Sequence, residues 1–165
     1  MIISVKEIRN FLISILIPLV IGYASSAIAQ ILSSVDMSTY YSQLIKPGFA
    51  PPSFIFPIAG IIIYILIGIS SYIILKKDYK STKVKDAMFY YWLQLGLNFL
   101  WCILFFGLEL RFTAMVDLII MIMVIIIMMI KFNKLDKRAM YLNIIYLLWS
   151  SYALFLNYFI WTINR

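Results

Sequence analysis

Five long apolar segments, separated by short charged stretches, limit what this chain can fold into more than any other feature of its sequence. They span residues 10–35, 53–75, 87–108, 112–130 and 139–163, and only the fourth contains a charged residue, Asp117. About 20 apolar residues suffice for a helix to cross the hydrocarbon core of a bilayer. Runs such as "LIIMIMVIIIMMI" lack the alternating polarity of a membrane β-barrel strand. The sequence therefore predicts an all-α integral membrane protein, a five-transmembrane-helix bundle in which residues 1–165 form a single domain.

The basic residues predict the orientation of this bundle. With five crossings, the segment before residue 10 and the connectors 76–86 and 131–138 lie on one side of the membrane, and they hold eleven of the 14 Lys and Arg residues. Lys46, Arg111 and Arg165 lie on the other side. Because basic connectors stay on the cytoplasmic side, we expect a protein of the bacterial cell membrane with its N-terminus in the cytoplasm and its C-terminus outside.

The first segment has an alternative interpretation. Lys6 and Arg9 precede an apolar stretch that ends in "SSAIAQ", and Ala27-Ile28-Ala29 resembles a signal-peptidase site. Cleavage at Ala29 would leave four crossings instead of five. The sequence leaves this alternative open, and the mass of the intact protein distinguishes the two.

The composition also excludes several classes of protein. Hydrophobic residues make up 64% of the chain and charged residues 13%, which is more apolar surface than a soluble domain of this size can bury. Histidine is absent and Cys102 is the only cysteine, so the chain offers no disulfide framework, no cluster of zinc ligands and no histidine general base. The net charge of +7 resides in connectors that orient the chain at a membrane. We therefore expect no metal, no catalytic residues, no required cofactor and no nucleic-acid partner.

Four of the five prolines are concentrated in "LIKPGFAPPSFIFP", residues 44–57. Proline fixes φ, lacks a backbone donor and disfavours a helical conformation at the preceding residue. This stretch therefore predicts a stiff, non-helical connector. The charge distribution places the proline-rich connector, residues 36–52, on the outer side of the membrane.

Two amides in the third segment define one face of a predicted helix. Gln94, Asn98, Trp101 and Phe105 recur at helical spacing. Because an unpaired amide in hydrocarbon is costly, this face should be turned into the bundle. Hydrogen bonds between helices and contacts with a ligand explain such a face equally well.

The fifth segment repeats this arrangement and the fourth adds an acid. Trp149, Ala153 and either Leu156 or Asn157 share a face of the predicted fifth helix. Asp117 is the one charge well inside a predicted crossing, which favours a functional role such as a proton relay. It also lies about one turn after Thr113, the expected cap, where the helix dipole stabilises an anion. Both interpretations of Asp117 stay open.

Three stretches of the chain resemble the translocator protein family, also called the tryptophan-rich sensory protein or peripheral benzodiazepine receptor family. They are "KPGFAPPSFIFPIAGIIIYILIG", "QLGLNFLWCILFFG" and "LLWSSYALFLNYFIWTIN", and they occur in the family's order from about residue 40 onward. The matched positions are Lys46, Pro47, Pro51, Pro52, Tyr64 and Gly68, then Gln94, Leu97, Asn98, Trp101, Phe105, Phe106, Gly107 and Asp117, then Trp149, Ala153, Leu156, Asn157, Trp161 and Asn164.

The resemblance implies a five-helix membrane bundle, often a homodimer, that encloses a cavity for flat hydrophobic ligands such as heme or protoporphyrin, and for sterols in some members. It also implies that the first connector covers the mouth of this cavity, where stiff prolines would reduce the ordering entropy lost on binding. Membrane lipid and a hydrophobic small molecule are then the expected partners. The ligand-binding positions that the resemblance implies are Phe49, Phe54, Phe56, Pro57, Ala59, Gln94, Asn98, Trp101, Trp149, Ala153 and Leu156.

Three departures from the family pattern concern its tryptophans. Phe49, Phe54 and Gly60 stand where the family usually has tryptophan. The two phenylalanines keep aromatic area but lose the indole donor. Gly60 loses the whole side chain, at a position linked in the family to light-dependent porphyrin breakdown, so we expect no such breakdown here and a wider cavity at that wall.

These features support four hypotheses. The leading one is a membrane binding protein or sensor for porphyrin-like or other flat hydrophobic ligands. A transporter of porphyrin or lipid-like molecules, with Asp117 as a proton site, is the alternative, and a porphyrin-degrading enzyme is less well supported. A membrane scaffold without a ligand predicts an interior filled by its own side chains.

Overall fold

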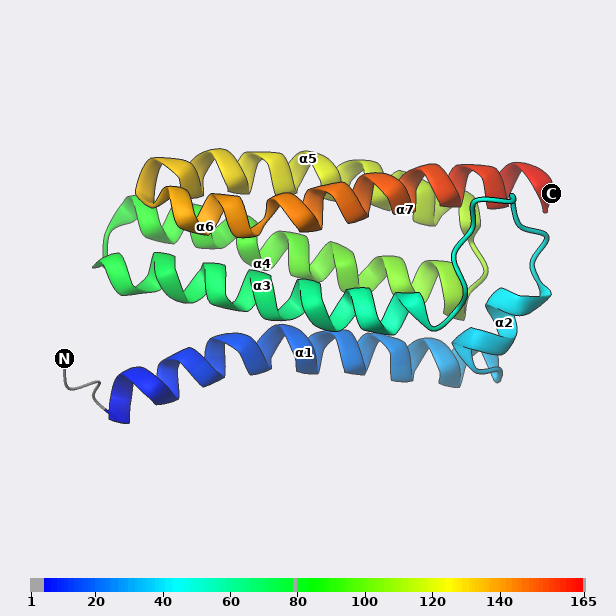
Figure 1. Ribbon diagram of the computed structural model, residues 1–165, viewed down its shortest axis with the longest axis horizontal. Helices are drawn as coiled ribbons and strands as arrows, with labels where there is room; N and C mark the ends of the chain where they lie inside the picture. The colour runs from blue at the N-terminus through cyan, green and yellow to red at the C-terminus, as the bar shows by residue number, and fades with distance from the viewer. Residues whose placement is uncertain (1–4, 79, 165) are drawn as a thin grey trace.

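The computed structural model describes residues 5–78 and 80–164 (Figure 1). These residues form seven α-helices and one short π-helix. The α-helices are α1 (Val5–Ser33), α2 (Met37–Gln43), α3 (Ile55–Asp78), α4 (Thr82–Cys102), α5 (Arg111–Leu135), α6 (Lys137–Leu142) and α7 (Ile144–Ile163), and the π-helix is η1 (Ile103–Gly107).

Five helical units in the described residues are long and apolar enough to cross a membrane. They are α1, α3, α4 continued by η1, α5, and α6 continued by α7. The predicted all-α, five-helix integral membrane protein is thereby confirmed. The helices extend beyond the predicted apolar segments, since α1 begins at Val5 rather than residue 10 and α4 at Thr82 rather than residue 87. Charged residues such as Lys6 and Lys83 are compatible with a helix whose ends have left the hydrocarbon core.

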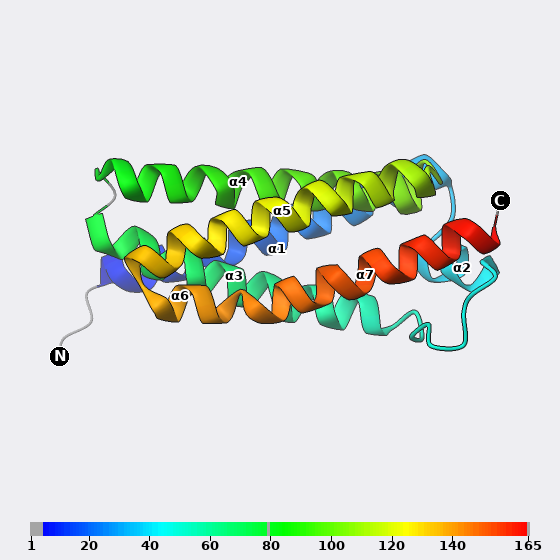
Figure 2. The same ribbon diagram turned by 90° about the horizontal axis from the view of Figure 1, so that it is seen from above.

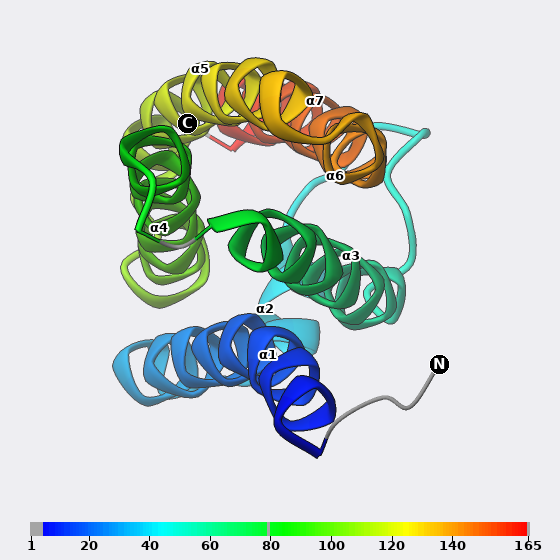
Figure 3. The same cartoon turned by 90° about the vertical axis from the view of Figure 1, so that its left-hand side faces the viewer.

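The crossings are arranged as a bundle with two distinct ends. The connector end carries α2 and residues 44–54, and the lysine-rich end carries the turns after α3 and α5 (Figures 1 and 2). α1 packs along α3, α4 packs along α5, and α5 also contacts α7. Seen from the lysine-rich end, α3 lies between α1 and the α6–α7 unit (Figure 3).

Small residues bring α1 against its neighbours. A Cβ atom at Gly68 of α3 would lie 2.6 Å from the carbonyl oxygen of Ser14 and 2.7 Å from Cα of Ile15. A Cβ atom at Gly107 of η1 would lie 3.1 Å from Cα of Ala29, which is fully buried. Because lipid supplies no hydrophobic force between helices, such backbone contact is a principal source of their association. Ala29, where the sequence allows cleavage, is therefore part of a packed interface.

The connector between α1 and α3 is partly helical. Asp36 caps α2, and its carboxylate accepts from the Thr39 N–H at 3.0 Å. The first part of the predicted connector is therefore helical, although the prolines farther along predict a non-helical stretch. Residues 44–54 are non-helical, as the prolines require. The last three residues of the predicted non-helical stretch, 55–57, instead begin α3, because proline is tolerated in the first turn of a helix. Asn164, at the end of α7, donates to the Ile45 carbonyl at 2.8 Å and accepts from its N–H at 2.9 Å. Proline and this clamp together fix the connector.

Two crossings are interrupted in ways that the apolar pattern does not predict. α4 gives way to the π-helix η1 near the connector end. Asn143 separates α6 from α7, and its buried amide donates to Ser70 Oγ and to the Ala139 carbonyl, each at 2.7 Å. Ser70 donates to the same carbonyl at 2.8 Å. The interruption at Asn143 is thus stabilised by a partner on α3.

Candidate functional site

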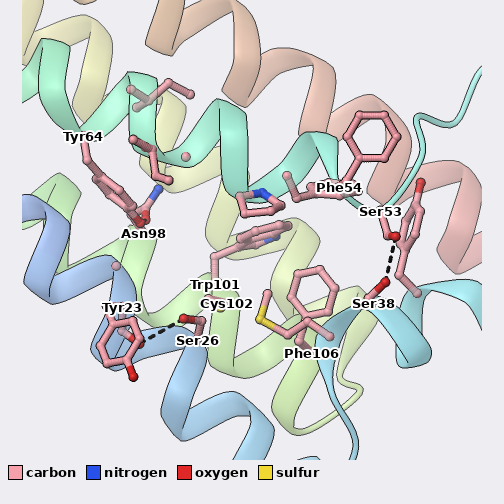
Figure 4. A pocket seen from close by; sticks show the side chains of 18 of the residues that line it. Tyr23, Ser26, Ser38, Ser53, Phe54, Tyr64, Asn98, Trp101, Cys102 and Phe106 are labelled. Carbon is pink, nitrogen blue, oxygen red and sulfur yellow. Dashed lines mark hydrogen bonds between the residues drawn. The ribbon is translucent and has the colours of Figure 1, made fainter.

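A cavity of about 770 Å³ lies at the connector end of the bundle, between α1, α3, α4 and α7 (Figure 4). Ligand sites in proteins typically enclose about 300–1,000 Å³, so the cavity has the size of a site for a drug-sized or larger molecule. Its lining residues are Leu19, Gly22, Tyr23, Ser26, Gln30, Asp36, Met37, Ser38, Tyr41, Ser53, Phe54, Phe56, Pro57, Gly60, Ile61, Ile63, Tyr64, Asn98, Trp101, Cys102, Phe106, Tyr146 and Trp149.

Aromatic rings form the wall of the cavity that faces α4 and α7. Phe56 contacts three rings, with centroid distances of 4.9 Å to Tyr41, 6.0 Å to Trp149 and 6.3 Å to Phe106. Trp101 lies edge-on to Phe106 at 5.9 Å. Rings packed in this way are held in place by one another, and their faces and edges suit a flat, apolar ligand.

The opposite wall is formed by α1 and α3. Gly22 of α1 faces the Tyr64 ring so closely that a Cβ atom there would overlap it. At Gly60, in contrast, a Cβ atom would approach only Tyr64 Cε2, at 3.9 Å. The space that a larger side chain would fill at Gly60 is therefore part of the cavity, which agrees with the wider wall expected from the sequence.

The connector covers the cavity at one end. Ser38 of α2 and Ser53, just before α3, share a hydrogen bond of 2.8 Å, and both line the cavity (Figure 4). Tyr41 of α2 is buried against Phe56, and burial raises the pKa of its phenol to about 12, so its hydroxyl stays protonated as a neutral donor. Asp36 at this rim has a pKa lowered by its hydrogen bonds to Thr39.

The cavity is not sealed from the side of the bundle. Tyr23, Phe54 and Ile61 line it and are also largely exposed, at 77%, 60% and 53%. These side chains come from α1, from the residue before α3 and from α3 itself. The cavity is therefore open to the side of the bundle along α1 and α3.

A chain of hydrogen bonds crosses the floor of the cavity. The Tyr64 hydroxyl donates to Asn98 Oδ1, and Asn98 Nδ2 donates to the Tyr146 hydroxyl at 3.4 Å. Tyr146 donates to Gln94 Oε1 at 2.7 Å, and its hydroxyl also lies 3.5 Å from Met121 Sδ. Within the described residues, no group of three His, Cys, Asp or Glu side chains can hold a metal ion.

The structure brings together many of the positions predicted for ligand binding. Phe54, Phe56, Pro57, Asn98, Trp101 and Trp149 line the cavity. Ala153 and Leu156 instead border a void of about 10 Å³ behind Phe56 and Trp101.

The remaining predicted positions lie farther away. Gln94 is fully buried and reaches the cavity only through Tyr146. Phe49 stacks on Phe155, with ring centroids 5.2 Å apart, and neither it nor Ala59 is among the lining residues.

Sequence reasoning missed the contribution of α1. Leu19, Gly22, Tyr23, Ser26 and Gln30 all line the cavity, but the resemblance begins only at about residue 40. The first apolar segment also has no polar stripe that would show which of its faces is turned inward. A small residue opposite a tyrosine, as at Gly22, becomes informative only once the pairing of α1 with α3 is known.

Comparison with known proteins identifies relatives over nearly the whole chain. The TspO/MBR family matches residues 14–162. The tryptophan-rich protein TspO of Archaeoglobus fulgidus is 35% identical over 159 residues, 96% of this chain and 99% of its own length. The protein of the same name from Chlorobaculum tepidum is 30% identical over 96% of this chain and 98% of its own length. The translocator protein of Sus scrofa is 33% identical over 76% of this chain and 75% of its own length. The resemblance noted in the sequence is confirmed, and the chain belongs to the TspO/MBR family of membrane proteins.

Proposed function

We propose that this protein binds porphyrin-like or other flat hydrophobic molecules in the cavity between α1, α3, α4 and α7, as a membrane receptor or sensor. The observation that carries the proposal is a cavity of about 770 Å³ walled by Phe56, Trp101, Phe106 and Trp149 beneath a clamped connector. These rings would stack against one face of a planar molecule, and α1 and Tyr64 would lie against its other face. A scaffold without a ligand would have its interior filled by its own side chains.

The polar groups around the cavity support a ligand that is mainly apolar. Among the described residues, no lysine or arginine lines the cavity, and Asp36 at its rim is the one charged lining residue. Polar groups that could orient a ligand include the Asn98 amide, the Ser38–Ser53 pair and the unpaired indole N–H of Trp101. The propionates of heme or protoporphyrin would then lie toward the open rim, and the tetrapyrrole ring would lie against the aromatic wall.

A matched pair of tryptophan substitutions on α1 tests this function. Leu19→Trp places an indole inside the cavity, whereas Val20→Trp places the same ring on an exposed position of the same helix. We expect Leu19→Trp to weaken binding of protoporphyrin by about tenfold or more, because the ring occupies ligand volume, and Val20→Trp to change it by about twofold or less. The absorbance change of protoporphyrin on titration into purified protein measures both. Equal affinities for the two variants, or no saturable binding by the unsubstituted protein, would contradict the proposal.

The lateral opening favours a second function, the transport of porphyrin or lipid-like molecules. A carrier needs access to its site from more than one direction, and the exposed lining residues Tyr23 and Ile61 supply a route that does not pass beneath the connector. Flux of protoporphyrin into proteoliposomes distinguishes transport from binding alone. Flux that saturates and is reduced by Leu19→Trp but not by Val20→Trp supports transport, and binding without flux excludes it.

A further inference from the structure

Eight buried side-chain atoms of the described residues have no hydrogen-bond partner, and three of them belong to polar side chains on neighbouring crossings around Tyr146. They are Gln94 of α4, Asp117 of α5 and Ser150 of α7, which are 0%, 5% and 1% exposed. The unpaired atoms are Gln94 Nε2, Asp117 Oδ2 and Ser150 Oγ. Buried polar atoms almost always have partners, because leaving one unpaired costs free energy, so three such atoms require an explanation.

The contacts of Tyr146 place these groups in the same region of the bundle. The Tyr146 hydroxyl of α7 lies 3.5 Å from Met121 Sδ of α5 and 2.7 Å from Gln94 Oε1. α5 runs away from the connector end and α7 runs toward it (Figures 1 and 2). Asp117 precedes Met121 by one turn, and Ser150 follows Tyr146 by one turn. Because the two helices run in opposite directions, both residues lie one turn from the Tyr146–Met121 contact, toward the connector end. Asp117 and Ser150 therefore lie at the same level of the interface between α5 and α7.

The dipole explanation for Asp117 does not fit its position in the helix. α5 begins at Arg111 with Leu110 at the cap position, and Thr113 does not cap it. Asp117 is thus in the second turn, whereas the favourable effect of a helix N-terminus is confined to the first.

No cation among the described residues compensates the carboxyl of Asp117. Tyr146 of α7 interacts electrostatically with Asp117 and with two further phenols, Tyr91 of α4 and Tyr64 of α3. η1 has no titratable residue, and the basic residues of α6 lie at the lysine-rich end. Arg111 directs its guanidinium to Glu109 at 3.4 Å and to the Asn164 carbonyl at 3.5 Å.

The unpaired atoms are chemically complementary. Gln94 Nε2 can only donate, Asp117 Oδ2 accepts, or donates when it carries a proton, and the Ser150 hydroxyl does both. One or two water molecules between them would satisfy all three, and a proton on Asp117 would remove the uncompensated charge. The donor N–H of Gln94 disfavours a metal cation at the same place.

We propose that Gln94, Asp117 and Ser150 form a hydrated proton-binding site behind the cavity, linked to it by the hydrogen-bond chain through Tyr146, Asn98 and Tyr64. The proton is held at Asp117 Oδ2. When a ligand enters the cavity, the hydrogen-bond chain transmits this change to the site by reorienting hydroxyl and amide dipoles. Because linkage is reciprocal, a ligand that favours protonated Asp117 binds more tightly as the pH falls. This second part rests on the proposed ligand binding, whereas the proton site itself does not.

Infrared spectroscopy of the ligand-free protein tests the proton site. We expect a carboxylic-acid carbonyl band that titrates with pH, shifts in heavy water and is missing in Asp117→Asn. Asp86→Asn is the matched control, since Asp86 is an exposed acid paired with Lys131 and its replacement should leave the band in place. Ser150→Ala should shift the band without abolishing it. A spectrum of Asp117→Asn identical to that of the unsubstituted protein at every pH would overturn the proposal.

Proton uptake on ligand binding tests the linkage. Calorimetric titration with protoporphyrin dimethyl ester, which has no carboxylates of its own, in two buffers of different ionisation enthalpy gives the protons exchanged per ligand bound. We expect uptake by the unsubstituted protein, none by Asp117→Asn, and reduced uptake by Tyr146→Phe, with affinity changing by at most about tenfold per pH unit, the limit for one linked proton. Equal uptake by the unsubstituted protein and Asp117→Asn refutes the linkage. Absence of any ester binding refutes the proposed function. The infrared band tests the proton site in either case, because it is measured without ligand.

Discussion

Single residues on α3 show how the same amino acid serves two different purposes in this bundle. Gly60 borders open space in the cavity, whereas Gly68 lets the backbone of α1 approach α3. A glycine inside a helix costs up to about 1 kcal/mol relative to alanine unless packing needs it. The two positions should therefore respond in opposite ways to the same substitution.

We predict that Gly60→Ala stabilises the protein by up to about 1 kcal/mol, and that Gly68→Ala destabilises it by about 1–3 kcal/mol. The added methyl at Gly68 would lie 2.6 Å from the Ser14 carbonyl oxygen, so the helices would have to separate. Unfolding of the two variants in mixed detergent micelles measures the difference. If both substitutions shift stability in the same direction, the assigned contact between α1 and α3 is incorrect.

At the residue scale, periodicity predicted the direction of some side chains and not of others. Asn98 and Trp101 were expected on an inward face and both line the cavity. Gln94 also lies on the inward face and is fully buried, but its amide contacts Tyr146 of α7 instead of lining the cavity. Residues four apart differ by about 40° around a helix, so they can face different neighbours in a tightly packed bundle. Which neighbour each would meet depends on the arrangement of helices, which the sequence does not display.

At the scale of elements, the connectors combine local sequence signals with distant contacts. Asp36 and Asp136 are helix caps that the sequence could have revealed, because an acid before a short polar or basic run favours a helix start. The π-helix η1 and the interruption at Asn143 could not be predicted in this way. Asn143 leaves the helical pattern because its amide binds Ser70 of α3, a partner distant in sequence.

Asp136 provides a prediction of pH dependence at the lysine-rich end. Hydrogen bonds from Arg138, followed by the ion pair with Lys77 at 2.8 Å, hold the pKa of its carboxyl well below the usual range. A lowered folded-state pKa means that its contribution is complete above the unfolded value of about 4 and is lost as the pH falls through the folded value. The thermal midpoint of Asp136→Asn should therefore lie below that of the unsubstituted protein at neutral pH. The difference between the two thermal midpoints should disappear only in strong acid. A difference that stays constant down to the most acidic pH would contradict this role.

At the scale of the whole molecule, the number of crossings followed directly from apolar length, but the arrangement of the helices did not. α1 and α5 are apolar on nearly all sides, so neither offers a stripe that fixes its rotation in the bundle. Apolar side chains occur on the exposed side of these helices, at Leu16, Val20 and Ile126, as well as on the buried side. Close contacts at Gly68 and Gly107, rather than hydrophobic periodicity, determine where α1 lies. The homodimer implied by the resemblance stays a prediction, and cross-linking in the native membrane tests it.

The orientation expected from the basic residues is a prediction for the intact molecule. In a Cys102→Ser background, Ser42→Cys at the connector end should react with a membrane-impermeant maleimide added to intact cells, because both ends of α2 are exposed. Thr82→Cys, at the lysine-rich end, should react only after the membrane is permeabilised. The opposite pattern of labelling would place the N-terminus outside and the cavity mouth in the cytoplasm.

The clamp between Asn164 and Ile45 has a consequence for biosynthesis. The two residues are separated by 119 positions, so a nascent chain emerging from the ribosome makes the proline stretch long before it makes the amide that secures it. Until the fifth helix is inserted, the compartment lacks both its Trp149 wall and its fastening. We therefore expect the proposed ligand to bind only to the fully translated bundle, and chains halted after the fourth helix should leave the translocon without it.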